Sequence, residues 1–144
     1  MAAVRRDRDD LTSEEMAAWR PFAFAATTVV SALDTEMKAA FGISHFDHAL
    51  LLVLVGSKRR RLRMSDLAQL LAVEPSSVTY RVRNLERGGL VERVRDQQDR
   101  RVTWAVITVK GMRLLRDAWP VHRDAIRRHF LSHVRSAGLR LESA

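Results

Sequence analysis

The sequence predicts a mainly α-helical protein that carries one small antiparallel β-ribbon. Two observations lead to this prediction. Apolar residues recur at helical spacing over most of the 144 residues, and glycines or prolines mark where one helix gives way to the next. Between residues 90 and 107 the spacing changes to period two, which is typical of two short strands. With 47% hydrophobic residues, a chain of this length is expected to form a single domain with a core.

The first helix is expected between Thr12 and Phe41. Thr12 and Glu15 have the spacing of a capping box, and Gly42 is a stop signal. A bend is expected at Pro21, since proline lacks the N–H of a helical hydrogen bond. At ~1.5 Å per residue this helix is roughly 40 Å long. One small domain cannot cover it, so its natural partner is a second copy of the chain.

Shorter elements follow. A second helix is expected to start at Ser44 or His45 and to end at Gly56. Residues 58–61 form a basic loop that either touches nucleic-acid phosphates or is simply solvated. Residues 62–64 are expected to form a short strand that completes the sheet of the ribbon.

Residues 64–87 have the pattern of two helices joined by a tight turn. Ser65 is expected to cap the first helix, and Pro75 suits the first position of the second, where a missing N–H costs nothing. Gly88 and Gly89 then stop the second helix. One apolar stripe of that helix is expected to be buried: Val78, Val82 and Leu85.

The other faces of this second helix are polar and basic. A helix of this kind fits the major groove of DNA, which is about 12 Å wide, whereas the plain alternative is a solvated surface. The candidate DNA contacts on the helix are Ser76, Ser77, Thr79, Tyr80, Arg81, Arg83 and Asn84.

The two strands, 90–95 and 102–107, are joined by a polar link that ends in two arginines. A guanidinium at the tip of such a hairpin can enter the minor groove, where the potential is most negative. The link supplies the remaining candidate DNA contacts: Asp99, Arg100 and Arg101. After the ribbon, Thr108 is expected to cap a last long helix that bends at Pro120.

Taken in this order, the segments resemble the MarR family of bacterial winged helix-turn-helix regulators. The matching phrases are residues 62–68, residues 85–93, Asp99-Arg100-Arg101, and Ile107-Thr108 with Gly111 following. The resemblance covers about Leu11 to Phe130. It implies a DNA-binding lobe at 44–107 and dimerisation helices at 11–43 and 108–144, while charge of both signs predicts a disordered arm at 1–10. Residues 131–144 depart from the family pattern, which normally adds a full amphipathic helix.

The resemblance also implies a function. We expect a homodimer that binds a pseudo-palindromic operator in double-stranded DNA and acts as a repressor. Arg101 matches the family's wing arginine, and Asp99 is expected to pair with a nearby arginine and to set the shape of the wing. Many relatives carry arginine where this chain has Tyr80, so its preferred DNA sequence should differ.

Members of this family often release DNA when an effector binds where the dimer helices meet the DNA-binding lobe. A planar phenolic or acidic ligand would suit an aromatic and imidazole lining. Ordinary core packing is the alternative for the residues concerned. The candidate lining is Trp19, Phe22, Phe46, Trp119 and His122.

The formal net charge is +8, and 22 of the 25 basic residues are arginine. A net charge of +6 lies between Lys58 and Arg101, which favours contacts to phosphates. The absence of cysteine excludes disulfides and thiol-based oxidant sensing, and it fits a reducing cytosol. Residues 21–32 are uncharged, but the acidic residues before them argue against a signal peptide, and the stretch is too short to span a membrane. We therefore expect a cytoplasmic protein.

Other chemistries find little support. His45 with His48, and His129 with His133, have spacings that two metal ligands could share, but no third ligand is evident, so no metal or cofactor is expected. The chain has no phosphate-binding glycine loop and no nucleophile motif, so we do not expect an enzyme. Two alternatives remain open, namely a ligand-sensing or dimerisation module without DNA binding and an RNA-binding winged helix.

Overall fold

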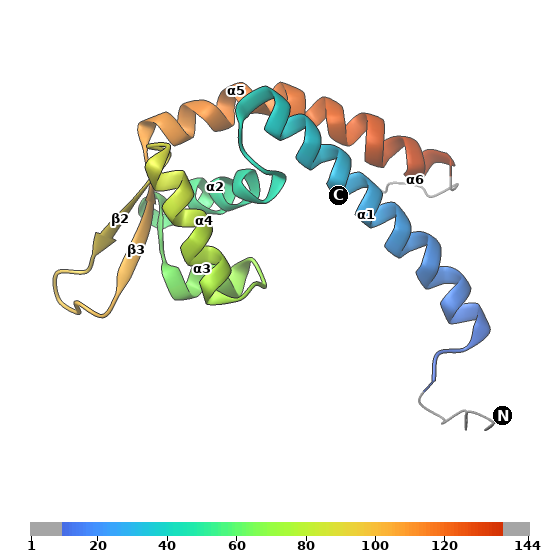
Figure 1. Cartoon of the computed structure of the whole chain (residues 1–144), viewed down its shortest axis with the longest axis horizontal. Coiled ribbons are helices and arrows are strands. Elements are labelled where there is room, and N and C mark those ends of the chain that lie inside the picture. Colours follow the sequence, from blue (N-terminus) through green and yellow to red (C-terminus); the bar gives the residue numbers. More distant parts are fainter. Residues whose placement is uncertain (1–9, 137–144) are drawn as a thin grey trace.

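The computed structural model describes residues 10–136 and is mostly helical with one small sheet (Figure 1). The elements in order are α1 (Ser13–Phe41), α2 (His45–Gly56), the turn η1 (Lys58–Arg60), β1 (Arg61–Arg63), α3 (Met64–Leu70), α4 (Pro75–Arg87), β2 (Val91–Arg95), β3 (Thr103–Ile107), α5 (Val109–Ile126), the turn η2 (Arg127–Leu131) and α6 (Ser132–Ser136). The expected fold class is confirmed. Most of the arm expected at 1–10, and the end of the atypical C-terminal segment from residue 137, lie outside the described residues.

Two parts are visible in Figure 1. The elements from α2 to β3 form a compact lobe, and α1 packs beside α5 and η2, which α6 continues, to form a long arm. Glu36 ties α1 to η2, because its Oε2 lies 2.5 Å from Arg128 Nη2 in an ion pair and its Oε1 lies 2.6 Å from His129 Nε2. Among residues 10–136 no single helix is long and apolar enough to cross a membrane, and α1 with α2 reaches that length only across an 80° bend.

The expected ends of α1 are confirmed. Thr12 and Glu15 form a reciprocal capping box, and Gly42 ends the helix at φ 69°, a left-handed conformation that favours glycine. The backbone stays helical through Pro21. Within α1 only Leu33 and Met37 are buried, so most of its length lies uncovered by its own chain.

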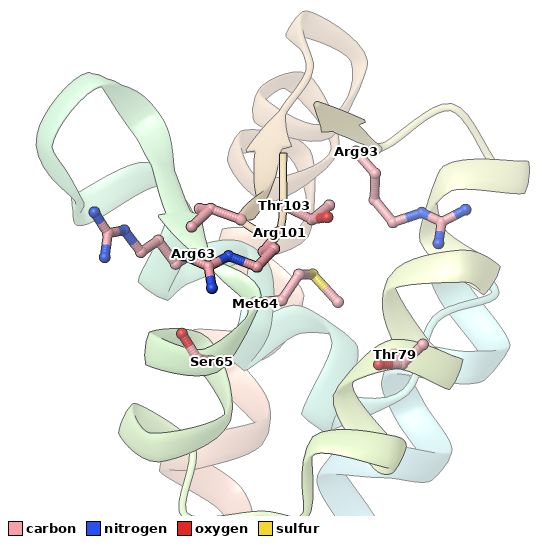
Figure 2. A pocket seen from close by; sticks show the side chains of 8 residues that line it. Arg63, Met64, Ser65, Thr79, Arg93, Arg101 and Thr103 are labelled. Carbon is pink, nitrogen blue, oxygen red and sulfur yellow. The ribbon is translucent and has the colours of Figure 1, made fainter. Parts of the chain in front are cut away.

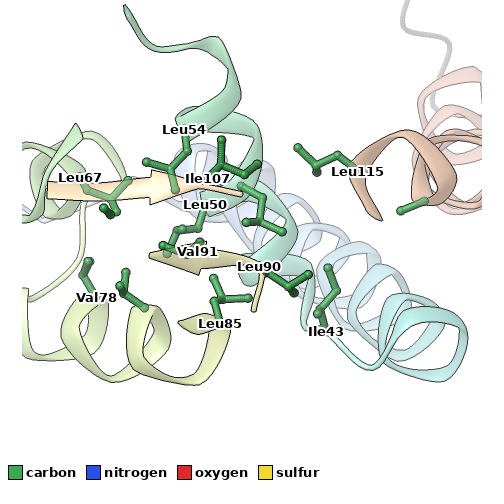
Figure 3. Packing of buried hydrophobic residues seen from close by; sticks show 14 of the residues in the cluster. Ile43, Leu50, Leu54, Leu67, Val78, Leu85, Leu90, Val91, Ile107 and Leu115 are labelled. Carbon is green, nitrogen blue, oxygen red and sulfur yellow. The ribbon is translucent and has the colours of Figure 1, made fainter. Parts of the chain in front are cut away.

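The core sits between α2, the α3–α4 pair and the sheet (Figure 3). A second capping box, formed by Ser44 and Asp47, starts α2. The stripe expected on α4 is confirmed, because Val78, Val82 and Leu85 are all buried against the core. Each such side chain contributes about 1.5–3 kcal/mol by leaving water. The result is an α4 fixed along one side, with its other side free.

The helix–turn–helix differs from expectation in one detail. Ser65 does not cap α3, because the helix already begins at Met64 and Arg63 occupies the cap position without a side-chain hydrogen bond. The Ser65 hydroxyl lies 3.3 Å from the Asp66 carboxylate instead. The strand β1 runs directly into α3, so sheet pairing sets where the helix starts. Pro75 occupies the first turn of α4, as expected.

The sheet has the order β1-β3-β2 and is antiparallel throughout, so the strand expected at 62–64 is present at Arg61–Arg63. Ala105 and Ile107 of β3 point into the core. The opposite face of β3 carries Trp104, which pairs with Arg63 of β1 and with Val94 of β2. The strand ribbon formed by β2, β3 and their connection is called the wing below.

The arm begins where expected, because the Thr108 hydroxyl accepts the N–H of Gly111 at the start of α5. The helix continues through Pro120 to Ile126. It then widens into the single π-helical turn η2 before α6.

Candidate nucleic-acid interface

The polar face of α4 is solvent-accessible in its first two turns. Ser76, Ser77 and Tyr80 are exposed, and Tyr80 keeps 66% of its surface accessible. Thr79 is half-buried, and its hydroxyl donates to the carbonyl of Pro75 at 2.9 Å. Further along the helix, Arg83 is exposed and Asn84 is half-buried. The face therefore offers hydroxyl, phenol and guanidinium groups to a partner.

Arg81 differs from these neighbours because its guanidinium is engaged within the lobe. Nη1 lies 3.2 Å from the Ser44 hydroxyl and 3.4 Å from the Asp47 carboxylate, and Cζ lies 4.3 Å from the centre of the Phe46 ring. A cation over an aromatic face adds an electrostatic attraction. Arg81 thus holds α4 against the start of α2.

At the tip of the wing, the Asp99 carboxylate accepts three hydrogen bonds from Arg101. Its Oδ1 accepts the Arg101 backbone N–H at 3.0 Å and Nε at 3.1 Å, and its Oδ2 accepts Nη2 at 3.3 Å. These bonds, the side-chain bond first, lower the pKa of Asp99. The expected pairing of Asp99 with an arginine is confirmed. The Arg101 side chain nevertheless remains 92% exposed, so its hydrogen bonds to Asp99 orient the side chain without covering it.

Asp96 organises the connection between the wing strands and was not among the expected site residues. Its Oδ1 accepts the backbone N–H groups of Gln98 and Asp99, and its Oδ2 accepts the indole N–H of Trp104 at 2.9 Å. Hydrogen bonds from the Asp99 N–H, the Trp104 indole and the Gln98 N–H lower the pKa of Asp96 to about 2. The signal for this turn in the sequence is an aspartate at the start of a hairpin connection.

The wing, α3 and α4 enclose a groove of about 340 Å³, called the arginine groove below (Figure 2). Its lining is Arg63, Met64, Ser65, Thr79, Arg93, Arg101, Val102 and Thr103. The lining therefore includes three arginines and three residues with a hydroxyl group, contributed by β1, α3, α4 and the wing. Such a set suits an anion with several oxygen atoms, such as a phosphate.

Six of the eight lining residues of this groove were not expected to belong to a site: Arg63, Met64, Ser65, Arg93, Val102 and Thr103. Arg93 is held by Glu86, whose Oε2 lies 2.8 Å from both Nε and Nη2 of the guanidinium. This bond also lowers the pKa of Glu86. The pairing register of the sheet brings these residues to the same groove, and no local sequence pattern predicts that register.

Comparisons with known proteins agree with this geometry. Residues 41–102 match the model of the MarR family. The crystal structure of Sco3205, a MarR family transcriptional regulator from Streptomyces coelicolor in complex with DNA, superimposes with a TM-score of 0.82. It is 33% identical, over 92% of this chain and 86% of that one. The chain belongs to the MarR family.

Two further MarR family relatives show the extent of the likeness. AbsC from Streptomyces coelicolor gives a TM-score of 0.78 at 32% identity, over 85% of this chain and 82% of that one. The regulator MhqR from Bacillus subtilis (strain 168) is 39% identical over 63 residues, which are 44% of this chain. That match spans only 43% of the length of MhqR. The family consists of transcriptional regulators built on a winged helix-turn-helix, and this protein shares their fold.

The candidate effector-pocket residues fall into separate places in this MarR family protein. Trp119 and His122 lie together on α5, with ring centres 6.3 Å apart, and Phe46 lies beneath Arg81 on α2. Trp19 and Phe22 contact each other with ring centres 5.9 Å apart, far from the others on the uncovered part of α1. At ~1.5 Å per residue, Trp19 is roughly 26 Å along the helix from Glu36, which contacts η2.

His122 belongs to a cluster of three imidazoles at the junction of α2 and α5, in which His48 and His122 are buried and His45 is half-buried. Its ring centre lies 4.3 Å from that of His48 and 5.4 Å from that of His45. Both ring nitrogens of His48 and of His122, and Nδ1 of His45, are buried without a hydrogen-bond partner within the described part of the chain. In residues 10–136 no three His, Cys, Asp or Glu side chains are placed to hold a metal ion.

Burial lowers the pKa of all three histidines, and for His45 the charge of Asp34 opposes the effect. For His48, burial and the neighbouring charges of His122 and His45 bring the pKa to about 4. A histidine whose pKa is lower in the folded state binds fewer protons there than in the unfolded chain. Its contribution to stability is therefore complete above about pH 6.5 and is lost as the pH falls towards 4.

Acidification is consequently expected to begin destabilising the protein at a pH above the range in which most carboxylates titrate. Between pH 6.5 and 4.5 we expect the free energy of unfolding to fall by about 2–3 kcal/mol, mainly through His48. Urea unfolding at several pH values measures this change. The variant His48→Leu should show a flatter profile over the same window. A wild-type profile that is already flat would contradict the expectation.

Proposed function

We propose that the protein binds a pseudo-palindromic operator in double-stranded DNA as a homodimer and represses transcription there. The observation that carries this proposal is the arginine groove, which lies between the exposed face of α4 and the tip of the wing. A helix in the major groove and a wing in the adjacent minor groove leave the intervening phosphates in that position. Such a function places the protein with the DNA in a bacterial cytoplasm, and it needs no cofactor.

The second copy is proposed from exposed apolar side chains on the arm. On α1, Trp19 is 54% exposed, Phe22 64% and Phe24 76%, and on α5 Trp119 is 51% exposed. Exposed apolar side chains of this number and size are typical of an interface. We assign residues 11–43 and 108–144 to dimerisation and residues 44–107 to DNA binding. Two-fold symmetry would then place the two copies of α4 about one DNA turn, ~34 Å, apart.

Different side chains would carry specificity and affinity. Ser76, Ser77 and Tyr80 are proposed to meet base edges, since they are exposed in the first turns of α4. Thr79, Arg83 and Asn84 would contact phosphates or outer bases, and Arg101 with Arg100 would reach the minor groove. Arg63 and Arg93 join this set as phosphate contacts. Arg81→Ala is expected to weaken all sequences alike, because Arg81 supports α4 from within the lobe.

Removing the wing arginine tests the proposal. Arg101→Ala is expected to weaken binding to the inverted repeat that the wild-type protein selects. The loss should be about tenfold, and the dependence of binding on salt should be reduced. Ser77→Ala or Tyr80→Ala should instead change sequence preference, by about 1–3 kcal/mol for each lost base contact. Arg116→Ala is the matched control, because it removes an exposed arginine from α5 that pairs with Asp117.

Fluorescence anisotropy with labelled duplexes measures these changes, and sequencing the fragments that the protein retains from a genomic pool supplies the inverted repeat. Binding to structured RNA but not to duplex DNA would favour an RNA-binding winged helix. Binding to neither would favour a ligand-sensing or dimerisation module.

Regulation by a small aromatic or acidic effector is part of the same proposal. We assign its site to the junction of the arm with the lobe, near Phe46, Trp119 and His122, and we assign Trp19 and Phe22 to the dimer interface. A ligand that prefers another spacing of the two α4 helices would shift the population away from the DNA-binding form. Operator affinity that no member of a panel of aromatic acids changes would argue against this part.

A further inference from the structure

A continuous path of contacts leads from the outer face of the sheet to the tip of the wing. It starts at Trp104, which lies half-buried in the middle strand. The guanidinium of Arg61 sits 4.4 Å from the centre of the indole ring, and that of Arg63 sits 5.4 Å away. A cation close to an aromatic ring is attracted to it, and the indole is favoured over other rings. The ring is thus fixed from the β1 side of the sheet.

The edge of the same ring holds the wing connection. The indole N–H donates to Asp96 Oδ2 at 2.9 Å, while Asp96 Oδ1 accepts the backbone N–H groups of Gln98 at 2.9 Å and Asp99 at 3.0 Å. Both carboxylate oxygens of Asp96 are therefore engaged. The backbone closes the same loop, since the Asp96 N–H donates to the Val102 carbonyl and the Val102 N–H to that of Asp99, both at 2.9 Å. These bonds fix the position of Asp99, whose carboxylate accepts hydrogen bonds from Arg101.

We propose that Trp104 and Asp96 are positioning residues for the wing arginine, acting through the conformation of the connection 96–102. This inference rests on the proposed DNA binding, in which Arg101 enters the minor groove. Arg101 is almost fully exposed, so its direction depends on its contact with Asp99. That contact depends on the conformation of the connection 96–102, to which the indole N–H of Trp104 on β3 is hydrogen-bonded through Asp96. A functional group that is held in its binding geometry loses less conformational entropy when it binds.

The plain alternative is that Trp104 only covers the outer face of the sheet. The two roles differ in which part of the indole they need. Covering the outer face of the sheet and attracting Arg61 and Arg63 require the aromatic ring. Positioning the connection 96–102 requires the indole N–H. The variant Trp104→Phe keeps a ring beneath Arg61 and Arg63 and removes the donor, so it separates the roles.

The test measures affinity for a duplex that carries the inverted repeat selected by the wild-type protein from a random pool. Trp104→Phe is expected to weaken binding by about fivefold, as expected for loosening one contact rather than deleting it. The double variant Trp104→Phe/Arg101→Ala should bind no more weakly than Arg101→Ala alone, because residues that act through one another are not additive. Asp96→Asn, which removes one acceptor oxygen, should behave like Trp104→Phe. Asp10→Asn makes the same charge change at an exposed residue before α1 and should leave affinity unchanged.

Three outcomes overturn the inference. The first is a Trp104→Phe variant that binds as tightly as the wild type. The second is a double variant in which the two losses add. The third is wild-type protein that retains no duplex from the random pool, and this result alone also removes the proposed function. Should Trp104→Phe fail to fold, Asp96→Asn and its combination with Arg101→Ala decide the question in the same way. Equal circular dichroism and unfolding temperature of the variants and the wild type show that the sheet itself is unchanged.

Discussion

Replacing Trp19 and Phe22 together by glutamate is expected to lower operator affinity by more than about 100-fold while the lobe stays folded. Both side chains are more than half exposed on α1 within the described part of the chain. Burying their surface against a second copy would stabilise the dimer, and burying four carboxylates at the same place would prevent it. A monomer would reach only one half-site, so the contribution of the other half-site would be lost.

Sedimentation velocity and duplex binding should be measured on the same samples. The conservative double variant Trp19→Phe/Phe22→Leu keeps the apolar surface and should remain dimeric with affinity close to that of the wild type. A glutamate variant that is monomeric yet still binds the full operator tightly would contradict the proposed arrangement. So would wild-type protein that sediments as a monomer.

Gly111→Ala is expected to destabilise the fold by about 3 kcal/mol, which is at the upper end of the range for overpacking. A Cβ at this position would overlap the backbone carbonyl oxygen of Leu90 and would lie 2.8 Å from Cγ1 of Ile107. Backbone cannot move aside as a flexible side chain can, and the same carbonyl accepts the N–H of Thr108. Relief of the overlap would have to separate α5 from the start of β2.

Urea unfolding followed by circular dichroism measures this loss. Gly88→Ala is the matched control, since a Cβ there would meet Leu85, Leu90 and Asn84 only at 3.5–3.8 Å, which is ordinary contact, and the backbone φ of −75° suits any residue. We expect that variant to change stability by no more than about 1 kcal/mol. Equal effects of the two substitutions would show that the approach of α5 to Leu90 is looser than the structure indicates.

Much of the fold was readable from local patterns. The capping residues Thr12 and Thr108, the stop at Gly42 and the proline at the start of α4 act within one turn of the chain, so their spacing alone predicts their role. The buried stripe of α4 follows from the helical period in the same way. Ser65 failed as a cap because β1 enters α3 directly, and strand pairing is set by residues more than 40 positions away.

The site was predicted less completely, for the same reason. The exposed residues of α4 and the wing arginine follow from patterns within one element. The arginine groove needs the sheet register that brings Arg63, Arg93 and Arg101 to one place, and the engagement of Arg81 with Asp47 needs the packing of α4 on α2. The three-histidine cluster likewise combines two residues of α2 with one of α5. Long-range packing decides these contacts, and a single sequence carries no local trace of it.

The arginine groove also bears on how the protein would find its operator. Its guanidinium and hydroxyl groups suit phosphates, which recur along every duplex, and none of them needs a particular base. The protein would therefore hold unrelated DNA weakly wherever it lands and slide or hop along it. The search would proceed along the chromosome rather than through open solution, and it would end only where the face of α4 recognises the bases beneath it.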